Sequence, residues 1–179
     1  KVIIDDKKAT NEAVQYQINQ GRKKIALVTT VDYVSVGKLR TDGYIKALQD
    51  NNIAFDENLI IKIEDVDTCE ITISKLLADK VIDAVFAVNE LFAVTILKTA
   101  HKMNLIVPKD LAIIAFTDGI ISKYSTPTIT TVSQSGIKMG KKAAEILIAR
   151  LESEEDDNDE EIYKTEIIET HLIERESTD

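Results

Sequence analysis

The sequence predicts an α/β protein in which a parallel β-sheet is covered by helices on both faces. Short β-branched apolar runs alternate along the chain with longer segments whose apolar residues recur at helical spacing. The strand-like runs are continuously apolar, as expected for strands that are buried on both sides. Repeated strand–helix pairs of this kind are typical of parallel sheets with crossover helices.

The first half of the chain supplies the first of these pairs. Val2–Ile4 is a β-branched run, and the helix predicted over 10–20 ends at Gly21, a residue type that commonly follows a helix. The pattern then predicts, in chain order, a strand at 24–30, a helix over 36–52, a strand at 59–63 and a helix over 70–80.

The second half continues this pattern. It predicts a strand at 83–88, a helix over 90–104, strands at 111–116 and 128–132, a helix over 136–151 and a last strand over 164–173. Pro108 stops the helix over 90–104 from continuing. The apolar stripe of the helix over 136–151 consists of Met139, Ala143, Ile146 and Leu147.

Composition and charge fit a globular protein without a basic nucleic-acid surface. The 179 residues are 44% hydrophobic and 30% charged, and the net charge is −9. No apolar run approaches the roughly 20 residues that a membrane-spanning helix needs.

Much of the acidity lies in residues 152–161, a run typical of a solvated loop. A Ca²⁺ site is the alternative, but the run lacks the spaced ligands and central glycine of an EF-hand. Because the sequence opens inside the apolar run KVII, we expect it to be a piece of a longer protein.

No group of residues predicts catalysis, a metal site or a cofactor. His101 and His171 have no partner at ligand spacing, and the sequence contains neither a G-x-S-x-G elbow nor a phosphate-binding P-loop. The single cysteine, Cys69, excludes an internal disulfide, and the neighbouring Glu70 would raise its thiol pKa rather than activate it. We therefore expect a protein that is not an enzyme.

Polar side chains follow three of the predicted strands at their carboxyl ends, where parallel sheets bind ligands. Arg40, Asn89 and Asp118 each come after a different strand. A guanidinium, a carboxamide and a carboxylate could together hold vicinal hydroxyls or a polar heterocycle. Each also has a simpler interpretation: Asn89 as a helix N-cap, Asp118 with Gly119 as turn residues, and Arg40 as the partner of Asp42 or another surface acid.

Several segments resemble one protein family, and they occur in that family's order. They are GRKKIALVTT, GKLRTDGYIKAL, VPKDLAIIAF, TPTITTVSQ, MGKKAAEILI and HLIERES. Together they make the chain similar, over nearly its whole length, to the LacI/GalR family of bacterial transcription regulators.

The resemblance implies a type I periplasmic-binding-protein-like fold, with two α/β lobes that are joined by three crossing strands. Residues 1–20 would belong to the first lobe and a crossover, and residues 21–132 would form the second lobe. Residues 133–163 would return a helix and the acidic loop to the first lobe, and residues 164–179 would supply a terminal strand and crossover.

The function that the resemblance implies is effector-controlled binding of operator DNA. A small molecule, a sugar or sugar derivative, would bind between the lobes of a cytoplasmic homodimer. DNA would be bound by a helix-turn-helix head that is not part of this chain. Two alternatives share the fold class: a secreted or periplasmic sugar-binding protein of an ABC transporter, and an enzyme on an α/β scaffold.

By position in the family, the resemblance implies an effector site made of Arg40, Asn89, Phe116, Thr117, Asp118 and Gln134. The sequence departs from the family at Glu90, where the family usually has aspartate, and at Thr117, where it usually has an acidic residue. It also departs at Ser135, where an effector-facing aromatic or polar residue is usual. We expect Asp118 to take over the acceptor role of the usual acid at Thr117, because Gly119 gives the turn the freedom to direct Asp118 inward.

The helix over 90–104 and the loop over 119–125 predict a dimer surface. Apolar residues cover more of the helix circumference than one sheet face can bury, and the loop presents further apolar side chains. The family uses the same two segments as dimer contacts. We expect a two-fold dimer through Leu91, Phe92, Thr95, Ile96, Ile120, Ile121 and Tyr124. The alternative is a helix that is buried wholly inside one chain.

Overall fold

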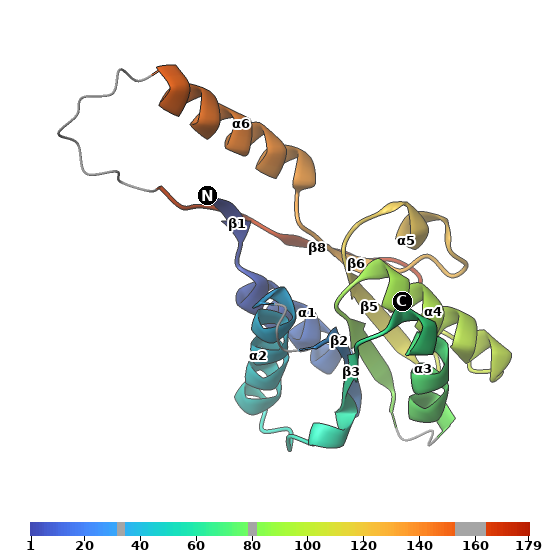
Figure 1. The fold of residues 1–179 in the computed structure, drawn as a ribbon. Coiled ribbons are helices and arrows are strands. Elements are labelled where there is room, and N and C mark those ends of the chain that lie inside the picture. The colour runs from blue at the N-terminus through green and yellow to red at the C-terminus, as the bar shows by residue number, and fades with distance from the viewer. Residues whose placement is uncertain (32–34, 79–81, 153–163) are drawn as a thin grey trace.

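The computed structural model describes residues 1–31, 35–78, 82–152 and 164–179, and its centre is a six-stranded β-sheet (Figure 1). The strand order is β3-β2-β4-β5-β6-β8. The first five strands are parallel, whereas β8 runs antiparallel to β6. The bounds are β2 Ile25–Thr30, β3 Ile60–Ile63, β4 Ala84–Ala87, β5 Ala112–Phe116, β6 Thr130–Ser133 and β8 His171–Ile173. The predicted α/β class with a mostly parallel sheet is confirmed.

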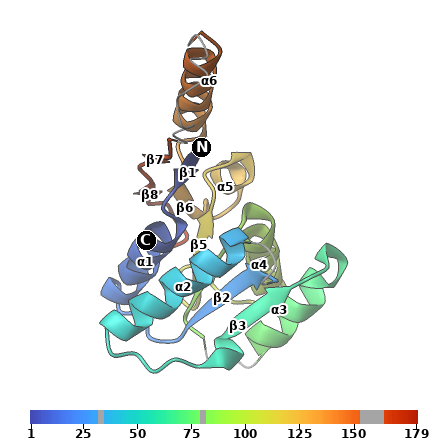
Figure 2. The same cartoon turned by 60° about the vertical axis from the view of Figure 1, so that its left-hand side comes forward.

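Helices cover both faces of this sheet, as the sequence predicts. One face carries α1 (Asp6–Asn19) and α2 (Ser35–Asp50), and the other carries α3 (Cys69–Ala78) and α4 (Glu90–Lys102) (Figure 1, Figure 2). Two 3₁₀ helices lie near β3; they are η1 (Glu57–Leu59) and η2 (Val66–Thr68). Within the described ranges, no helix is both long and apolar enough to cross a membrane.

The core lies on both sides of β4 and β5, the central strands. Every residue of these two strands is buried, which explains why their sequences are continuously apolar. Phe86 and Phe116 meet edge to face with ring centroids 5.8 Å apart. Tyr44 of α2 is fully buried and donates its hydroxyl to the Ile25 carbonyl at 2.8 Å, so its one polar group is satisfied inside the core.

The helix α1 begins earlier than the expected residue 10. Asp5 precedes it, and the Asp5 carboxylate accepts a hydrogen bond from the Lys8 backbone N–H at 2.9 Å, which satisfies one of the free donors of the first turn. Ala9, Ala13 and Val14 of α1 are buried in the main core. The segment 6–19 therefore packs with the six-stranded sheet, although the sequence assigned 1–20 to the first lobe and a crossover.

Two further elements differ from the sequence prediction. The loop expected over 119–125 contains a short helix, α5 (Ile120–Tyr124). The single last strand expected over 164–173 is two strands, β7 (Glu166–Ile168) and β8, because the chain leaves one sheet after β7 and enters the other at β8. Residues 153–161 of the acidic run lie outside the described residues.

A small second unit lies beside the main sheet. There β1 (Val2–Ile4) pairs with β7 in parallel, and α6 (Gly136–Glu152) contacts β1 and projects from the lobe (Figure 1, Figure 2). No residue of α6 is buried, and its exposed apolar residues are Ile137, Leu147, Ile148 and Leu151. The sequence assigns β1, α6 and β7 to the first lobe and crossovers, and this assignment stays a prediction.

Candidate effector site

The carboxyl ends of β2, β4 and β5 lie side by side at one edge of the sheet, because these strands are parallel neighbours. The structure brings Arg40 to this edge, where it contacts both Val88, the residue after β4, and Phe116, the last residue of β5. Asn89 and Thr117 follow directly in sequence. Arg40 thus joins the ends of β4 and β5. The convergence of Arg40, Asn89 and Asp118 as an effector site stays a prediction.

Arg40 is buried, with a side chain only 7% exposed, and it holds several elements together. Its Nε donates to Oδ1 of Asp6 at 2.8 Å, and its Nη1 donates to the Val88 carbonyl. Its Cζ lies 3.6 Å from the centroid of the Phe116 ring. Burial lowers the pKa of Arg40, and the charge of Asp6 opposes this effect. The pairing acid is thus the buried Asp6, not the surface acid considered from the sequence.

Phe116 is fully buried beneath the Arg40 guanidinium and against Phe86. A cation over the face of an aromatic ring is an attractive arrangement. In this geometry Phe116 lies against Arg40 and supports its position. Phe116 as a direct effector contact stays a prediction.

Asn89 is the N-cap of α4, so the capping role considered from the sequence is confirmed. Its Oδ1 accepts a hydrogen bond from the Phe92 backbone N–H at 2.8 Å. Because the oxygen is engaged by the helix, an effector at this edge would meet the amide NH₂ group, which is a donor. Capping and effector binding are compatible for this side chain.

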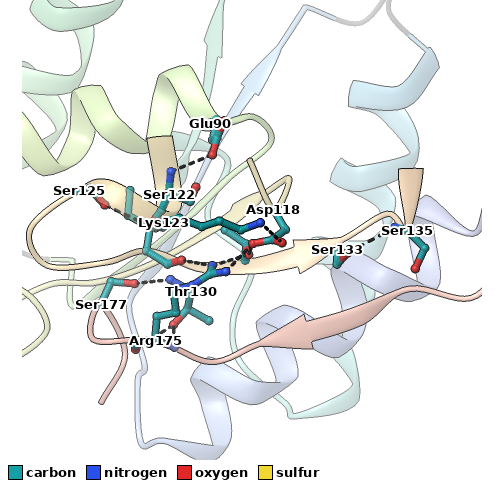
Figure 3. Close-up of polar contacts among 12 residues, drawn as sticks. Glu90, Asp118, Ser122, Lys123, Ser125, Thr130, Ser133, Ser135, Arg175 and Ser177 are labelled. Atoms are coloured by element: carbon teal, nitrogen blue, oxygen red, sulfur yellow. Dashed lines mark hydrogen bonds and ion pairs between the residues drawn. The ribbon is translucent and has the colours of Figure 1, made fainter. Parts of the chain in front are cut away.

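Asp118 sits in a cluster of charges (Figure 3). One carboxylate oxygen pairs with Nη2 of Arg175 and accepts from Oγ1 of Thr131, and the other lies 3.0 Å from Nζ of Lys123. Burial by itself raises the pKa of Asp118, but the hydrogen bonds from Arg175 and Lys123 outweigh it and the net pKa lies below its ordinary value. An effector hydroxyl would have to compete with these partners, and the acceptor role of Asp118 stays a prediction.

The reason for a glycine at position 119 differs from the one expected. Gly119 has φ −102° and ψ −172°, a backbone conformation that any residue adopts, so backbone freedom is not what the turn requires. A Cβ at this position would instead meet the Glu90 carboxylate. The absence of a Cβ at position 119 leaves room for this carboxylate.

We expect the variant Asp118→Asn to lose about 1–2 kcal/mol of stability at neutral pH, because the charge-assisted bonds to Arg175 and Lys123 are weakened. The folded-state pKa of Asp118 is depressed, so its pairing stabilises the fold above the unfolded-state pKa of about 3.9 and is lost as the pH falls through the lower folded-state pKa. Urea unfolding of wild type and variant at pH 7 and at pH 3 would show a difference that shrinks in acid. Asp50→Asn, which removes the exposed pair of Asp50 with Lys46, is the control and should change stability far less. A difference that does not depend on pH would contradict the charge pairing.

Thr117 and Gln134 are partly buried. The Thr117 carbonyl accepts from the Gly119 backbone N–H at 3.0 Å, which closes the turn after β5. Gln134 lies between β6 and α6, at the point where the chain leaves the main sheet. Both lie at the ends of strands of the main sheet, and their part in effector binding stays a prediction.

The expected dimer surface divides into exposed and buried residues. Phe92 and Ile96 lie in the core, 3% and 0% exposed, so their apolar surface is covered by this chain itself. Thr95 is partly buried and donates its hydroxyl to the Leu91 carbonyl. The side chains that remain exposed are Leu91, Ile120, Ile121 and Tyr124. The wide apolar face of α4 is explained by packing on the sheet and against α3 and α5, so only part of the predicted set is available to a partner.

Neither histidine nor the cysteine forms part of the site. His101 and His171 are exposed, at the end of α4 and on β8. Cys69 is buried at the start of α3, and burial, together with the charge of Glu70, raises the pKa of its thiol, as the sequence predicts.

Sequence reasoning missed Asp6 and Arg175 and, for Glu90, noted the departure from the family but not its contact with α5. Asp6 pairs with Arg40, Glu90 bonds to α5, and Arg175 pairs with Asp118. The segment HLIERES contains Arg175 and was noted only as a family resemblance. Strand-end position, the signal used for the other residues, cannot find these three, because none of them lies directly after a strand of the parallel sheet.

Comparison with known proteins shows which family this chain resembles. Residues 14–178 match the model of a periplasmic binding protein-like domain. The HTH-type transcriptional regulator MalR of Clostridium butyricum is 36% identical over 97% of this chain and 51% of its own length. The HTH-type transcriptional regulator CelR of Thermobifida fusca is 28% identical over 98% of this chain and 51% of its own length. The chain spans about half the length of the curated relatives it matches.

Solved structures agree with this result. A structure described as a transcriptional regulator CelR–cellobiose complex superposes with a TM-score of 0.87 at 28% identity, over 98% of this chain and 53% of that one. The transcription regulator CcpA of Lactococcus lactis superposes with a TM-score of 0.85 at 26% identity, over 99% of this chain and 64% of that one. These relatives are transcriptional regulators rather than enzymes. The chain belongs to the LacI family of transcriptional regulators, as a periplasmic-binding-protein-like domain of that family.

Proposed function

We propose that this chain is the effector-binding and dimerisation region of a cytoplasmic LacI-type regulator, in which a carbohydrate bound at the strand-end edge modulates binding to operator DNA. The observation that carries the proposal is the position of Arg40, which contacts Val88 and Phe116, the residues that directly precede Asn89 and Thr117. The groups at this edge, a guanidinium, an amide and a hydroxyl, suit a ligand rich in hydroxyls. The related CelR structure contains cellobiose, which supports the same ligand class.

The mechanism would be a shift between arrangements of the two lobes. An effector that binds one arrangement better than the other stabilises it by the difference in binding free energy. Such couplings are typically about 1–3 kcal/mol, which is 5–150-fold in affinity. DNA would be bound by a helix-turn-helix head outside this chain. A basic head of that kind upstream of Lys1 would support regulation, whereas a signal peptide there would support the transport alternative.

We expect Asn89→Asp to weaken effector binding at least tenfold without lowering the melting temperature. Aspartate caps a helix about as well as asparagine, so α4 keeps its N-cap, but the amide donors that would face the effector are lost. Calorimetric titration with cellobiose and a panel of other neutral disaccharides, on wild type and variant, measures the change. Lys46→Ala, on the exposed end of α2, should bind as wild type does. Equal affinities of Asn89→Asp and wild type would place Asn89 outside the effector site.

We expect Ile121→Asp to weaken dimerisation at least tenfold. Ile121 is 40% exposed on α5, beside Ile120 at 73% and Tyr124 at 84%, and a buried unpaired carboxylate is unfavourable in an apolar interface. Sedimentation equilibrium gives the dissociation constants of both proteins. Ile71→Asp, an exposed isoleucine of α3 that is 62% exposed, is the matched control and should leave association unchanged. A wild-type protein that remains monomeric at tens of micromolar would rule out dimerisation through this surface.

A further inference from the structure

The short helix α5 is capped by another part of the chain. Gly119 occupies its N-cap position and has no side chain to accept a hydrogen bond. Instead, Oε1 of Glu90, from the first turn of α4, accepts from the Ser122 backbone N–H at 2.8 Å. Figure 3 shows the Glu90 carboxylate directed at Ser122.

Ser122 is the point at which α5 is fixed to the lobe. It is fully buried, its N–H is bonded to Glu90, and its carbonyl accepts from the Ile129 N–H at 2.9 Å. Another contact of α5 with a charged group is the pair of Lys123 and Asp118, in which the Lys123 side chain is 47% exposed. The Glu90 bond is made to the backbone of a fully buried residue, whereas the pair is made by an exposed lysine side chain.

Glu90 and Gly119 fit each other. A Cβ built at position 119 would lie 2.6 Å from the Glu90 Cδ, a distance at which one of the two must move. The backbone of Gly119 does not itself require glycine, and the absence of a Cβ leaves the Glu90 carboxylate its space. A side chain at position 119 would push the carboxylate away from Ser122.

We propose that Glu90 is a positioning residue that joins the effector edge to the α5 surface. Glu90 follows Asn89 directly, and the helix it holds carries the exposed side chains of Ile120, Ile121 and Tyr124. A change in position of the first turn of α4 is thereby passed to α5. The inference rests on the proposed function, because the proposed dimerisation is what gives the α5 surface a role.

A set of variants at two positions tests the inference in the full chain. We expect Glu90→Ala to speed amide hydrogen exchange at Ser122 at least tenfold and to weaken dimerisation at least fivefold. Glu90→Gln keeps an acceptor oxygen and should stay within twofold of wild type in both measurements. Gly119→Ala should act like Glu90→Ala. The double variant Glu90→Ala/Gly119→Ala should be no worse than Glu90→Ala, because without the carboxylate the added methyl group has room.

The results separate the inference from the function on which it rests. Unchanged exchange at Ser122 in Glu90→Ala, or full additivity in the double variant, would overturn the docking role. A wild-type dimer whose association is unaffected by Glu90→Ala, while exchange at Ser122 increases, would overturn the positioning role alone. A monomeric wild type would contradict the proposed dimerisation, and exchange at Ser122 would still decide whether Glu90 docks α5.

Discussion

The variant Arg40→Ala is expected to lower the free energy of unfolding by about 3–5 kcal/mol, the loss typical of breaking a buried ion pair from one side. Its partner Asp6 has a side chain only 10% exposed, so the carboxylate would remain in the core without its counter-ion. The bond to the Val88 carbonyl and the contact with the Phe116 ring would be lost as well. Urea unfolding monitored by circular dichroism measures the change.

Two comparisons make this result specific to the buried pair. The double variant Arg40→Met/Asp6→Asn removes both charges, and we expect it to lose less stability than the sum of the single variants. Lys46→Ala breaks an exposed pair on the same helix and should have no comparable effect. If Arg40→Ala keeps wild-type stability but loses effector binding, Arg40 acts as a ligand contact alone. Any loss of effector affinity is interpretable only at temperatures where the variant is folded.

The variant Arg175→Ala is expected to lower the free energy of unfolding by about 2–4 kcal/mol, slightly less than Arg40→Ala because the site is less buried. The guanidinium donates to the Ile129 carbonyl at 2.8 Å and to Thr131 Oγ1 at 2.9 Å, and it pairs with Asp118 (Figure 3). Without Arg175, each of these three acceptors loses a hydrogen-bond donor. One of the acceptors is the Asp118 carboxylate, whose side chain is only 15% exposed. Thermal and urea unfolding at neutral pH would show the loss.

Arg22→Ala is the matched control for this prediction. Arg22 donates to the backbone carbonyls of Asp83, Pro108 and Lys109, which are uncharged acceptors. We therefore expect a smaller loss from Arg22→Ala than from Arg175→Ala. The combination Arg175→Ala/Asp118→Asn should recover part of the stability, because no carboxylate then remains without its partner. Equal losses from the two arginine variants would mean that the pairing with Asp118 contributes nothing.

The sheet and its helices could be predicted from the sequence because their signals are local. Continuous apolar runs mark β4 and β5, and apolar spacing marks α2 and α4. The helix α5 was missed because five residues are too few to show a helical period, and the capping acceptor comes from Glu90, far away in sequence. The helical spacing of apolar residues can be recognised in a segment of several turns, but not in a single turn.

The candidate site was predicted only in outline. The rule that ligands bind at the carboxyl ends of parallel strands selected Arg40, Asn89 and Asp118. It could not show that Arg40 pairs with Asp6 or that Asp118 pairs with Arg175, because these partners are brought together by tertiary packing over separations of 34 and 57 residues. The position of a residue at a strand end can be predicted from the local sequence. The direction of its side chain depends on partners that are distant in sequence.

The place of β8 at the edge of the main sheet determines when this lobe can finish folding during synthesis. β8 pairs with β6, and the residues just after it are bonded to the sheet: the Ser177 hydroxyl donates to the Ile113 carbonyl at 2.6 Å, and its N–H donates to the Thr128 carbonyl at 2.9 Å. The sheet therefore stays incomplete until residues 171–178 have left the ribosome. Until then β6 has an unpaired edge, which is a surface on which a nascent chain can pair with the wrong strand or with a chaperone.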